Sequence, residues 1–128
     1  MRLLLDTHVL LWAVIEPSRL RAQVRMTLED PVNEVLFSAA SVWEMAIKAA
    51  LGRADFQVSP RAILEAALET GFTELPVLSA AALRVTDLPH HHRNPFDRLL
   101  VAQAMTEPAV LYTADATLCA YSELVFRV

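Results

Sequence analysis

The chain has 128 residues, of which 55 % are hydrophobic, and a net charge of −4 at pH 7. This length suits one domain that buries a core without disulfides or a structural metal, so we predict a single domain over residues 1–128. The acidic balance argues against a nucleic-acid-binding protein that works through a broad basic face. The high hydrophobic fraction predicts more apolar surface than one fold hides, and hence an oligomer or a partner.

Short apolar runs alternate with segments of helical spacing along the chain. In order, they predict a strand at 2–5, a helix at 7–15, a helix capped by Ser18 and running to 29, a strand at 34–37 and a helix at 40–51. The next elements are a helix from Ser59-Pro60 to 70 that closes at Gly71, a strand at 72–75 and a helix at 79–85. The last ones are a helix from Asn94-Pro95 to 106, a strand at 109–113, a helical turn at 116–120 and a strand at 124–127. Strands separated by helices imply right-handed crossovers, so the predicted fold class is α/β: a three-layer α/β/α sandwich around a mostly parallel sheet of four or five strands.

Membrane and export signals are not found in these segments. Charges or prolines interrupt every apolar stretch before it reaches the roughly 20 residues of a membrane helix. The start, MRLLLDT, lacks the longer apolar region and the small-residue cleavage site of a signal peptide. We therefore expect a cytoplasmic protein with no membrane partner.

Two acidic residues follow predicted strands. Asp6 comes after the run RLLL, and Asp115 comes after AVLYTA. Ligands of doubly wound sheets bind beyond the carboxyl ends of the strands, so this placement is a first functional signal. Each aspartate is explained equally well as the cap of the helix that follows it.

Two further acids fall in the first turns of predicted helices. Glu44 ends a capping-box pattern that starts at Ser41, and Asp97 follows Asn94 and Pro95, where the helix dipole favours a carboxylate. Either residue could merely stabilise its helix. Three of the four acids, however, stand in very apolar settings (LLLD, SVWEMAI and NPFDRLL), and all four could converge at one end of the sheet.

Converging carboxylates repel one another. At about 4 Å, two unit charges in an intermediate dielectric cost on the order of 4 kcal/mol, so at least one carboxylate would hold a proton in the bare protein. A divalent cation removes this repulsion, and ligation by oxygen alone suits Mg²⁺ or Mn²⁺ rather than Zn²⁺. Such a cluster fits phosphoryl chemistry, in which the metal bridges acid and phosphate.

The segments that carry these acids, LLLDTHVLLW, SAASVWEMAIK, HHHRNPFDRLLVAQA and LYTAD, occur in this order over essentially the whole chain. Together they resemble the PIN-domain ribonucleases, and above all the VapC group of toxins from type II toxin-antitoxin systems. One difference is Asn94, because relatives similar to this chain often have Asp there. The resemblance implies that the places of the family's metal-binding and catalytic acids are taken by Asp6, Glu44, Asp97 and Asp115.

By this resemblance the protein is a metal-dependent endoribonuclease with Mg²⁺ or Mn²⁺ as its cofactor. Such an enzyme hydrolyses an RNA phosphodiester with metal-activated water that attacks in line, and it leaves 5′-phosphate and 3′-hydroxyl ends. The resemblance also implies a homodimer and a cognate antitoxin protein whose tail enters the active-site groove. Both would use the surplus apolar surface.

Two other functions fit parts of the sequence. The aspartate-nucleophile phosphatases also place Asp after a first strand, but they typically carry a second acid two residues later, where this chain has His8. A PIN-like fold that binds RNA or a partner without cutting is the second alternative. The four acids speak against it, and Asn94 speaks for it.

Three consecutive histidines, His90 to His92, precede the helix of Asp97. Successive residues of an extended segment alternate in direction, so the three cannot all face one ion, and we predict a polar loop with Asp97 as the ligand. Thr7 and Thr113 are predicted to support the acids beside them.

The cationic and aromatic neighbours of the acids leave several roles open. Lys48 is placed for an ion pair within its helix, and Arg98 could hold phosphate. Trp12, Trp43 and Phe96 are predicted to be core or dimer-interface residues, although RNA-binding proteins do stack bases on exposed aromatics.

Overall fold

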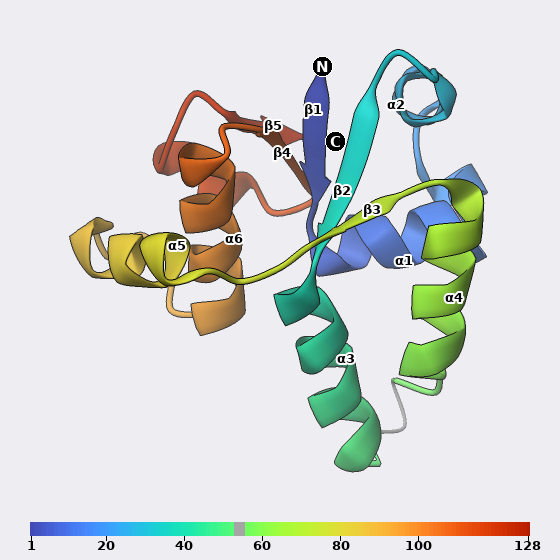
Figure 1. The fold of residues 1–128 in the computed structure, drawn as a ribbon, viewed down its shortest axis with the longest axis horizontal. Helices are drawn as coiled ribbons and strands as arrows, with labels where there is room; N and C mark the ends of the chain where they lie inside the picture. The colour runs from blue at the N-terminus through green and yellow to red at the C-terminus, as the bar shows by residue number, and fades with distance from the viewer. Residues whose placement is uncertain (53–55) are drawn as a thin grey trace.

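A computed structural model describes residues 1–52 and 56–128. Its strands are β1 (Arg2–Leu5), β2 (Glu34–Ser38), β3 (Thr73–Leu75), β4 (Val110–Thr113) and β5 (Val125–Arg127). Its helices are α1 (Thr7–Ile15), α2 (Ala22–Glu29), α3 (Ala39–Ala50), α4 (Pro60–Thr70), α5 (Ser79–Arg84) and α6 (Pro95–Thr106), with short 3-10 helices η1 (Pro17–Arg19), η2 (Val85–Asp87) and η3 (Ala116–Ala120). The strands form one parallel sheet in the order β3-β2-β1-β4-β5 (Figure 1). The predicted α/β sandwich is confirmed, and its sheet has five strands.

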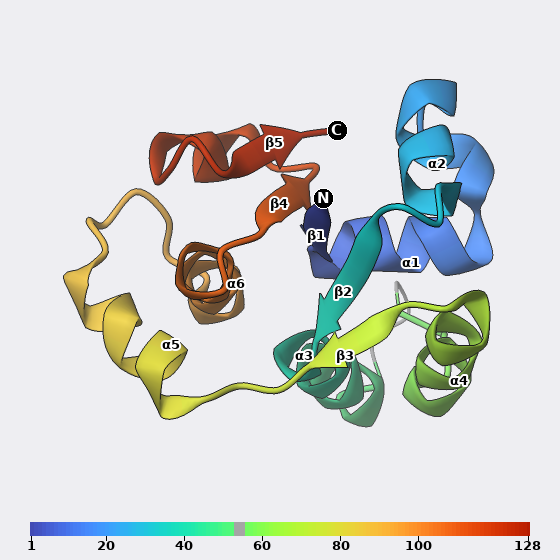
Figure 2. The same cartoon turned by 45° about the horizontal axis from the view of Figure 1, so that its top comes forward.

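Each face of the sheet carries its own core. On β1, Leu3 and Leu5 point into a cluster with residues of α1, α2 and α4, and Leu4 points into a second cluster with residues of α6 and η3. Figure 2 shows α1, α2 and α4 on one side of β1, and α5 and α6 on the other. Because both faces are covered, the central strands are continuous apolar runs rather than alternating ones.

The strand order fixes where a ligand can bind. The chain runs from β1 outward to β2 and β3, then returns to the other side of β1 and continues through β4 to β5. The carboxyl ends of β1 and β4 are therefore neighbours. The connection after β1 leads to β2 on one side of the sheet, and the connection after β4 leads to β5 on the other. This switch point is the usual ligand site of a doubly wound sheet.

Most predicted element boundaries agree with the structure, and Gly71 closes α4 in the left-handed conformation, with φ +100°. The predicted cap at Ser18 is wrong. Ser18 lies within η1, and α2 starts only at Ala22, with no side-chain cap. The cause is Leu20, whose extended backbone interrupts the helical path because its side chain is buried in the core.

Several large apolar side chains stay on the surface, as the composition predicts. Met26, Val32, Leu51 and Leu83 are among the most exposed. Within the described ranges, no helix has the length and apolar character that crossing a membrane requires.

Candidate functional site

Asp6 lies between β1 and α1, and both oxygens of its carboxylate accept hydrogen bonds. Oδ1 accepts the backbone N–H of Val9 at 2.8 Å, so Asp6 is the N-cap of α1. Oδ2 accepts the hydroxyl of Thr113 at 2.6 Å and the backbone N–H of Ala114 at 3.3 Å. Burial raises the pKa of Asp6 even though these hydrogen bonds act in the opposite direction. The residue is a helix cap, and it also joins the carboxyl ends of β1 and β4.

Glu44 lies in the second turn of α3 and is buried. The N-cap of α3 is Ser38, so the predicted capping box between Ser41 and Glu44 is wrong. Oε1 of Glu44 instead accepts the hydroxyl of Thr7 at 2.7 Å, and Oε2 lies 3.2 Å from Nζ of Lys48. The Glu44 carboxylate is therefore held against Thr7 at the start of α1, and Thr7 directly follows Asp6 in the sequence.

Asp97 lies in the first turn of α6, and Asn94 is the N-cap of this helix. Oδ1 of Asn94 accepts the backbone N–H of Phe96 at 2.9 Å and that of Asp97 at 3.4 Å. An amide oxygen at this position caps the helix as a carboxylate would. Among the described residues, the Asp97 carboxylate accepts no hydrogen bond, and Nε2 of His92 is 3.8 Å from its Oδ2.

Asp115 follows β4 and caps η3, because its Oδ1 accepts the backbone N–H of Thr117 at 2.9 Å. Its Oδ2 lies 2.8 Å from Nε2 of His92. Nδ1 of that ring accepts the backbone N–H of Asn94 at 3.0 Å, so the imidazole carries its proton on Nε2 and donates it to Asp115. Burial acts to raise the pKa of Asp115, but the hydrogen bonds from Thr117 and His92 outweigh it and lower the pKa.

The structure brings the four acids together at the switch point of the sheet. Burial and the negative charges of Asp6 and Glu44 raise the pKa of Asp97 to about 6, and the charge of Asp115 adds to the shift. Burial is the largest cause of this shift, and the charge effects show that Asp6 and Glu44 lie in the surroundings of Asp97. Ligand atoms of His92, Asp97 and Asp115 also lie within 4.8 Å of one another.

The donor atoms of this acidic cluster, formed by Asp6, Glu44, Asp97 and Asp115, fit a hard divalent cation. The four acids offer carboxylate oxygens, which Mg²⁺ and Mn²⁺ prefer. Asp97 combines a raised pKa with an absence of hydrogen-bond donors in the described part of the chain, so its charge has the most to gain from a cation. Nε2 of His92 is engaged as a donor, which leaves the oxygens as the ligand set.

The sequence did not predict the contact between His92 and Asp115. Alternation along an extended segment excludes three histidines from one ion, but it leaves room for one of them beside the site. His92 is that one, whereas the ring of His91 packs edge-on against Tyr121 at a centroid distance of 5.0 Å. The signal in the sequence was the position of His92 two residues before the helix cap Asn94.

Arg98 does not face the acids but holds the loop that carries the histidines. It is buried, and its guanidinium donates to the backbone oxygens of Val85, Leu88 and Pro89 at 3.1, 3.4 and 2.9 Å. A further bond reaches the hydroxyl of Tyr121 at 3.1 Å. With these donors committed to the loop, Arg98 is a structural residue and not the phosphate ligand considered from the sequence.

Replacing Arg98 by Met should leave these carbonyls without their donor. We expect the free energy of unfolding to fall by roughly 2 to 4 kcal/mol, because buried polar groups without partners are costly. Urea unfolding measures the change. Arg84→Met, at an exposed position on α5, is the matched control and should change stability by less than about 0.5 kcal/mol. Equal stability of the two variants would contradict the structural role of Arg98.

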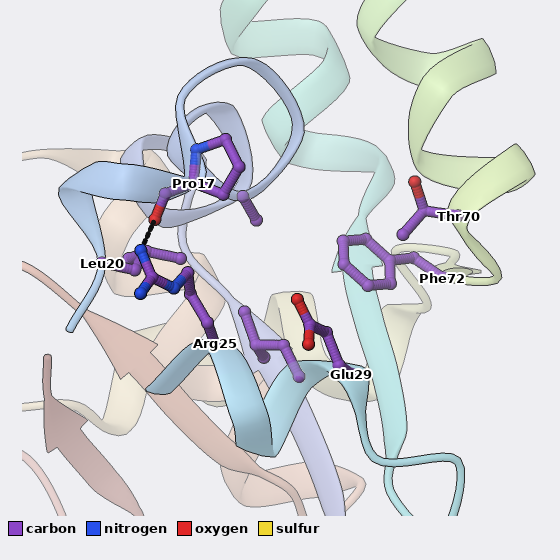
Figure 3. Close-up of a pocket in the computed structure, with 8 residues that line it drawn as sticks. Pro17, Leu20, Arg25, Glu29, Thr70 and Phe72 are labelled. Carbon is purple, nitrogen blue, oxygen red and sulfur yellow. Dashed lines mark hydrogen bonds between the residues drawn. The ribbon is translucent and has the colours of Figure 1, made fainter. Parts of the chain in front are cut away.

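A separate cavity of about 280 Å³ lies among α1, η1, α2 and the end of α4. Figure 3 shows Leu20, Arg25, Glu29 and Phe72 around it, with Arg25 donating to the backbone oxygen of Pro17 at 3.4 Å. None of the four clustered acids lines it. This cavity is therefore distinct from the acidic cluster.

The fold is that of a doubly wound α/β protein, with the acidic cluster near the switch point of its sheet. A match to the PIN domain family spans residues 3–124, and the chain belongs to this family. The family predicted from the sequence motifs is thus confirmed.

Two solved structures share the fold. One is VapBC2 from Rickettsia felis bound to a DNA fragment from their promoter, with a TM-score of 0.71 and 13 % identity over 100 % of this chain and 98 % of that chain. The other is FitAcB from Neisseria gonorrhoeae, with a TM-score of 0.60 and 23 % identity over 97 % of this chain and 96 % of that chain. No curated protein matches the sequence.

Proposed function

We propose that the protein is a metal-dependent endoribonuclease of the VapC type, the toxin of a toxin-antitoxin pair. The observation that carries the proposal is the position of Asp97 among three other acids near the switch point, where burial and, after it, the charges of Asp6, Glu44 and Asp115 raise the pKa of Asp97 to about 6. Membership of the PIN domain family supports a nuclease. The likeness in fold to the VapBC2 and FitAcB structures supports a toxin of this kind.

The proposed ligands of Mg²⁺ or Mn²⁺ are Asp6, Glu44, Asp97 and Asp115, which are also the proposed catalytic residues. When bound by these residues, such an ion would supply Lewis-acid chemistry: it would lower the pKa of water and offset negative charge on phosphodiester oxygens. The chain fixes the ligands: a threonine hydroxyl holds each of Asp6 and Glu44, and His92 holds Asp115. Fixed ligands reduce the reorganisation that the reaction requires.

The proposed partners are an RNA substrate, a cognate antitoxin and a second copy of the chain. The net charge of −4 argues against a broad basic face. The metal bound by the acidic cluster would therefore supply much of the attraction for phosphate. Exposed apolar side chains such as Met26, Val32 and Leu83 offer surface for protein partners. An enzyme that cuts cellular RNA would act in the cytoplasm.

Metal dependence of RNA cleavage tests the proposal. Purified protein incubated with structured RNA and Mn²⁺ should produce fragments with 5′-phosphate and 3′-hydroxyl ends, and EDTA should stop the reaction. Asp6→Asn should lower the rate by at least about 100-fold, since it removes one proposed ligand. Cleavage in EDTA, or full activity of Asp6→Asn, would overturn the mechanism.

Binding of the ion should also stabilise the fold, because only the folded chain assembles the four acids. The free energy of unfolding should rise by roughly 2.7 kcal/mol at a metal concentration of about 100 times Kd. Thermal unfolding in millimolar Mn²⁺ and in EDTA measures this effect as a shift in Tm. Asp97→Asn is the matched control and should show a much smaller shift. An unchanged wild-type Tm would contradict the metal site.

A further inference from the structure

Trp43 is an exposed aromatic residue on α3. It precedes Glu44 on α3, and 62 % of its surface is accessible, so it is not the core residue considered from the sequence. Its ring meets Phe96 edge-on, with the centroids 5.3 Å apart and the planes at 70°. Phe96 directly precedes Asp97. The two aromatics therefore form a contact pair, and each directly precedes one of the four acids in the sequence.

Phe96 lines a cavity of about 420 Å³ together with Glu44, Lys48 and Arg93. Trp43 is not a lining residue, but its exposed ring packs against Phe96. Ile47, which also lines the cavity, lies one turn after Trp43 on the same face of α3. Each of the two segments that line the cavity thus supplies apolar side chains and one cation: Ile47 and Lys48 from α3, and Phe96 and Arg93 from the start of α6 and the loop before it. The volume is within the range of pockets for small organic ligands.

The charges at this cavity favour an anionic ligand. Lys48 lies 3.2 Å from Glu44 and offsets the charge of that acid. Arg93 is exposed and, among the described residues, makes no ion pair. It also lines a neighbouring cavity of about 570 Å³ with His90 and His92. A guanidinium that lines one cavity with Glu44 and a second with His92 is placed to bind phosphate.

We propose that this cavity binds one nucleotide of a single-stranded RNA next to the bond that is cut, with its base against Trp43 and Phe96 and its phosphate at Arg93. The inference rests on the proposed endoribonuclease function. Unpaired bases stack on exposed aromatic rings, and backbone phosphates pair with arginine. Bases held in a duplex cannot reach such a surface, so the substrate is single-stranded at this point.

Binding can be measured apart from cleavage. The probe is a fluorescein-labelled single-stranded hexaribonucleotide, titrated at low salt in EDTA, with fluorescence anisotropy as the readout. Trp43→Ala should weaken binding roughly 5- to 150-fold, and Trp43→Phe should restore most of the loss. Arg93→Ala should weaken binding and lower the slope of log Kd against log salt concentration by about 0.7. The matched controls, Phe126→Ala and Arg127→Ala, alter an exposed aromatic and an exposed arginine on β5 and should bind as the wild type does.

Several results would overturn this nucleotide site. They are wild-type affinity in Trp43→Ala, equal losses in the β5 controls, or no measurable binding by the wild-type protein. Wild-type RNA affinity with an altered oligomeric state of Trp43→Ala on size exclusion would assign the aromatic pair to a protein interface instead. A cleavage assay with Mn²⁺ separates the two proposals. If the wild-type protein does not cleave RNA but binds it, and Trp43→Ala weakens that binding, the nuclease proposal is rejected and the nucleotide site is retained.

Discussion

Replacing Asp97 by Asn is expected to abolish metal-dependent RNA cleavage and, in the same molecule, to stabilise the fold at neutral pH. The cause of both effects is the position of this carboxylate, where burial and the charges of Asp6 and Glu44 raise the pKa of Asp97 to about 6. Asn removes a proposed ligand and its charge, so activity should fall by at least about 100-fold. It also removes the repulsion that the ionised carboxylate suffers in the metal-free protein.

The sign of the stability change follows from the two pKa values of Asp97. The folded protein keeps the proton up to a pH of about 6, whereas the unfolded chain releases it near the ordinary value of 3.8. The free energy of unfolding of the wild type therefore falls as the pH rises through this window, by on the order of 2 kcal/mol, and then levels off. Asn does not ionise, so the variant lacks this loss.

Urea unfolding in EDTA from acidic to neutral pH measures the prediction. The two proteins should have similar stability near the lower pKa, and the Asn variant should be more stable at neutral pH. Asp87→Asn is the matched control, because Asp87 is exposed in η2. A variant that cleaves RNA at the wild-type rate, or whose relative stability does not change with pH, would contradict the place given to Asp97.

The sheet could be predicted from the sequence because strands buried on both faces of a parallel sheet consist of continuous apolar residues. RLLL precedes a segment of helical spacing, EVLF and VLYT each lie between two such segments, and all three are central strands. Local patterns fail where a distant contact decides. The start of α2 is set by Leu20, which leaves the helical path to reach a core built from several other elements.

The elements that carry the four candidate acids could be predicted from the sequence, but the hydrogen bonds of these acids could not. Asp6 and Asp115 follow strands and Asp97 opens a helix, so topology brings these three positions together, whereas Glu44 lies in the second turn of α3. The bond from Thr113 to Asp6 joins residues 107 positions apart, and the bond from Thr7 to Glu44 crosses from α1 to α3. Only the packed fold shows that Glu44 points to Thr7 rather than to its own helix start. The same holds for the guanidinium of Arg98, whose partners are backbone oxygens without any sequence signature.

Replacing His92 by Ala is expected to weaken metal binding roughly 10- to 100-fold, the usual cost of losing a residue that orients a ligand. Nε2–H of His92 donates to Oδ2 of Asp115 at 2.8 Å, and the backbone N–H of Asn94 fixes the ring through Nδ1. His92→Gln should keep most of the affinity, because its amide N–H can take the place of Nε2–H. His90→Ala, in the same loop, is the matched control and should bind Mn²⁺ as the wild type does.

The imidazole itself distinguishes this role from direct ligation of the metal. A histidine that orients Asp115 keeps its proton on Nε2 when Mg²⁺ is added, whereas a ligating Nε2 must lose that proton. Two-bond ¹⁵N–¹H correlation spectra of labelled protein report which ring nitrogen is protonated, independently of any cleavage assay. We expect the Nε2–H form of His92 with and without Mg²⁺. If Mg²⁺ moved the proton to Nδ1, the bond from Asn94 would break and His92 would join the carboxylates as a ligand.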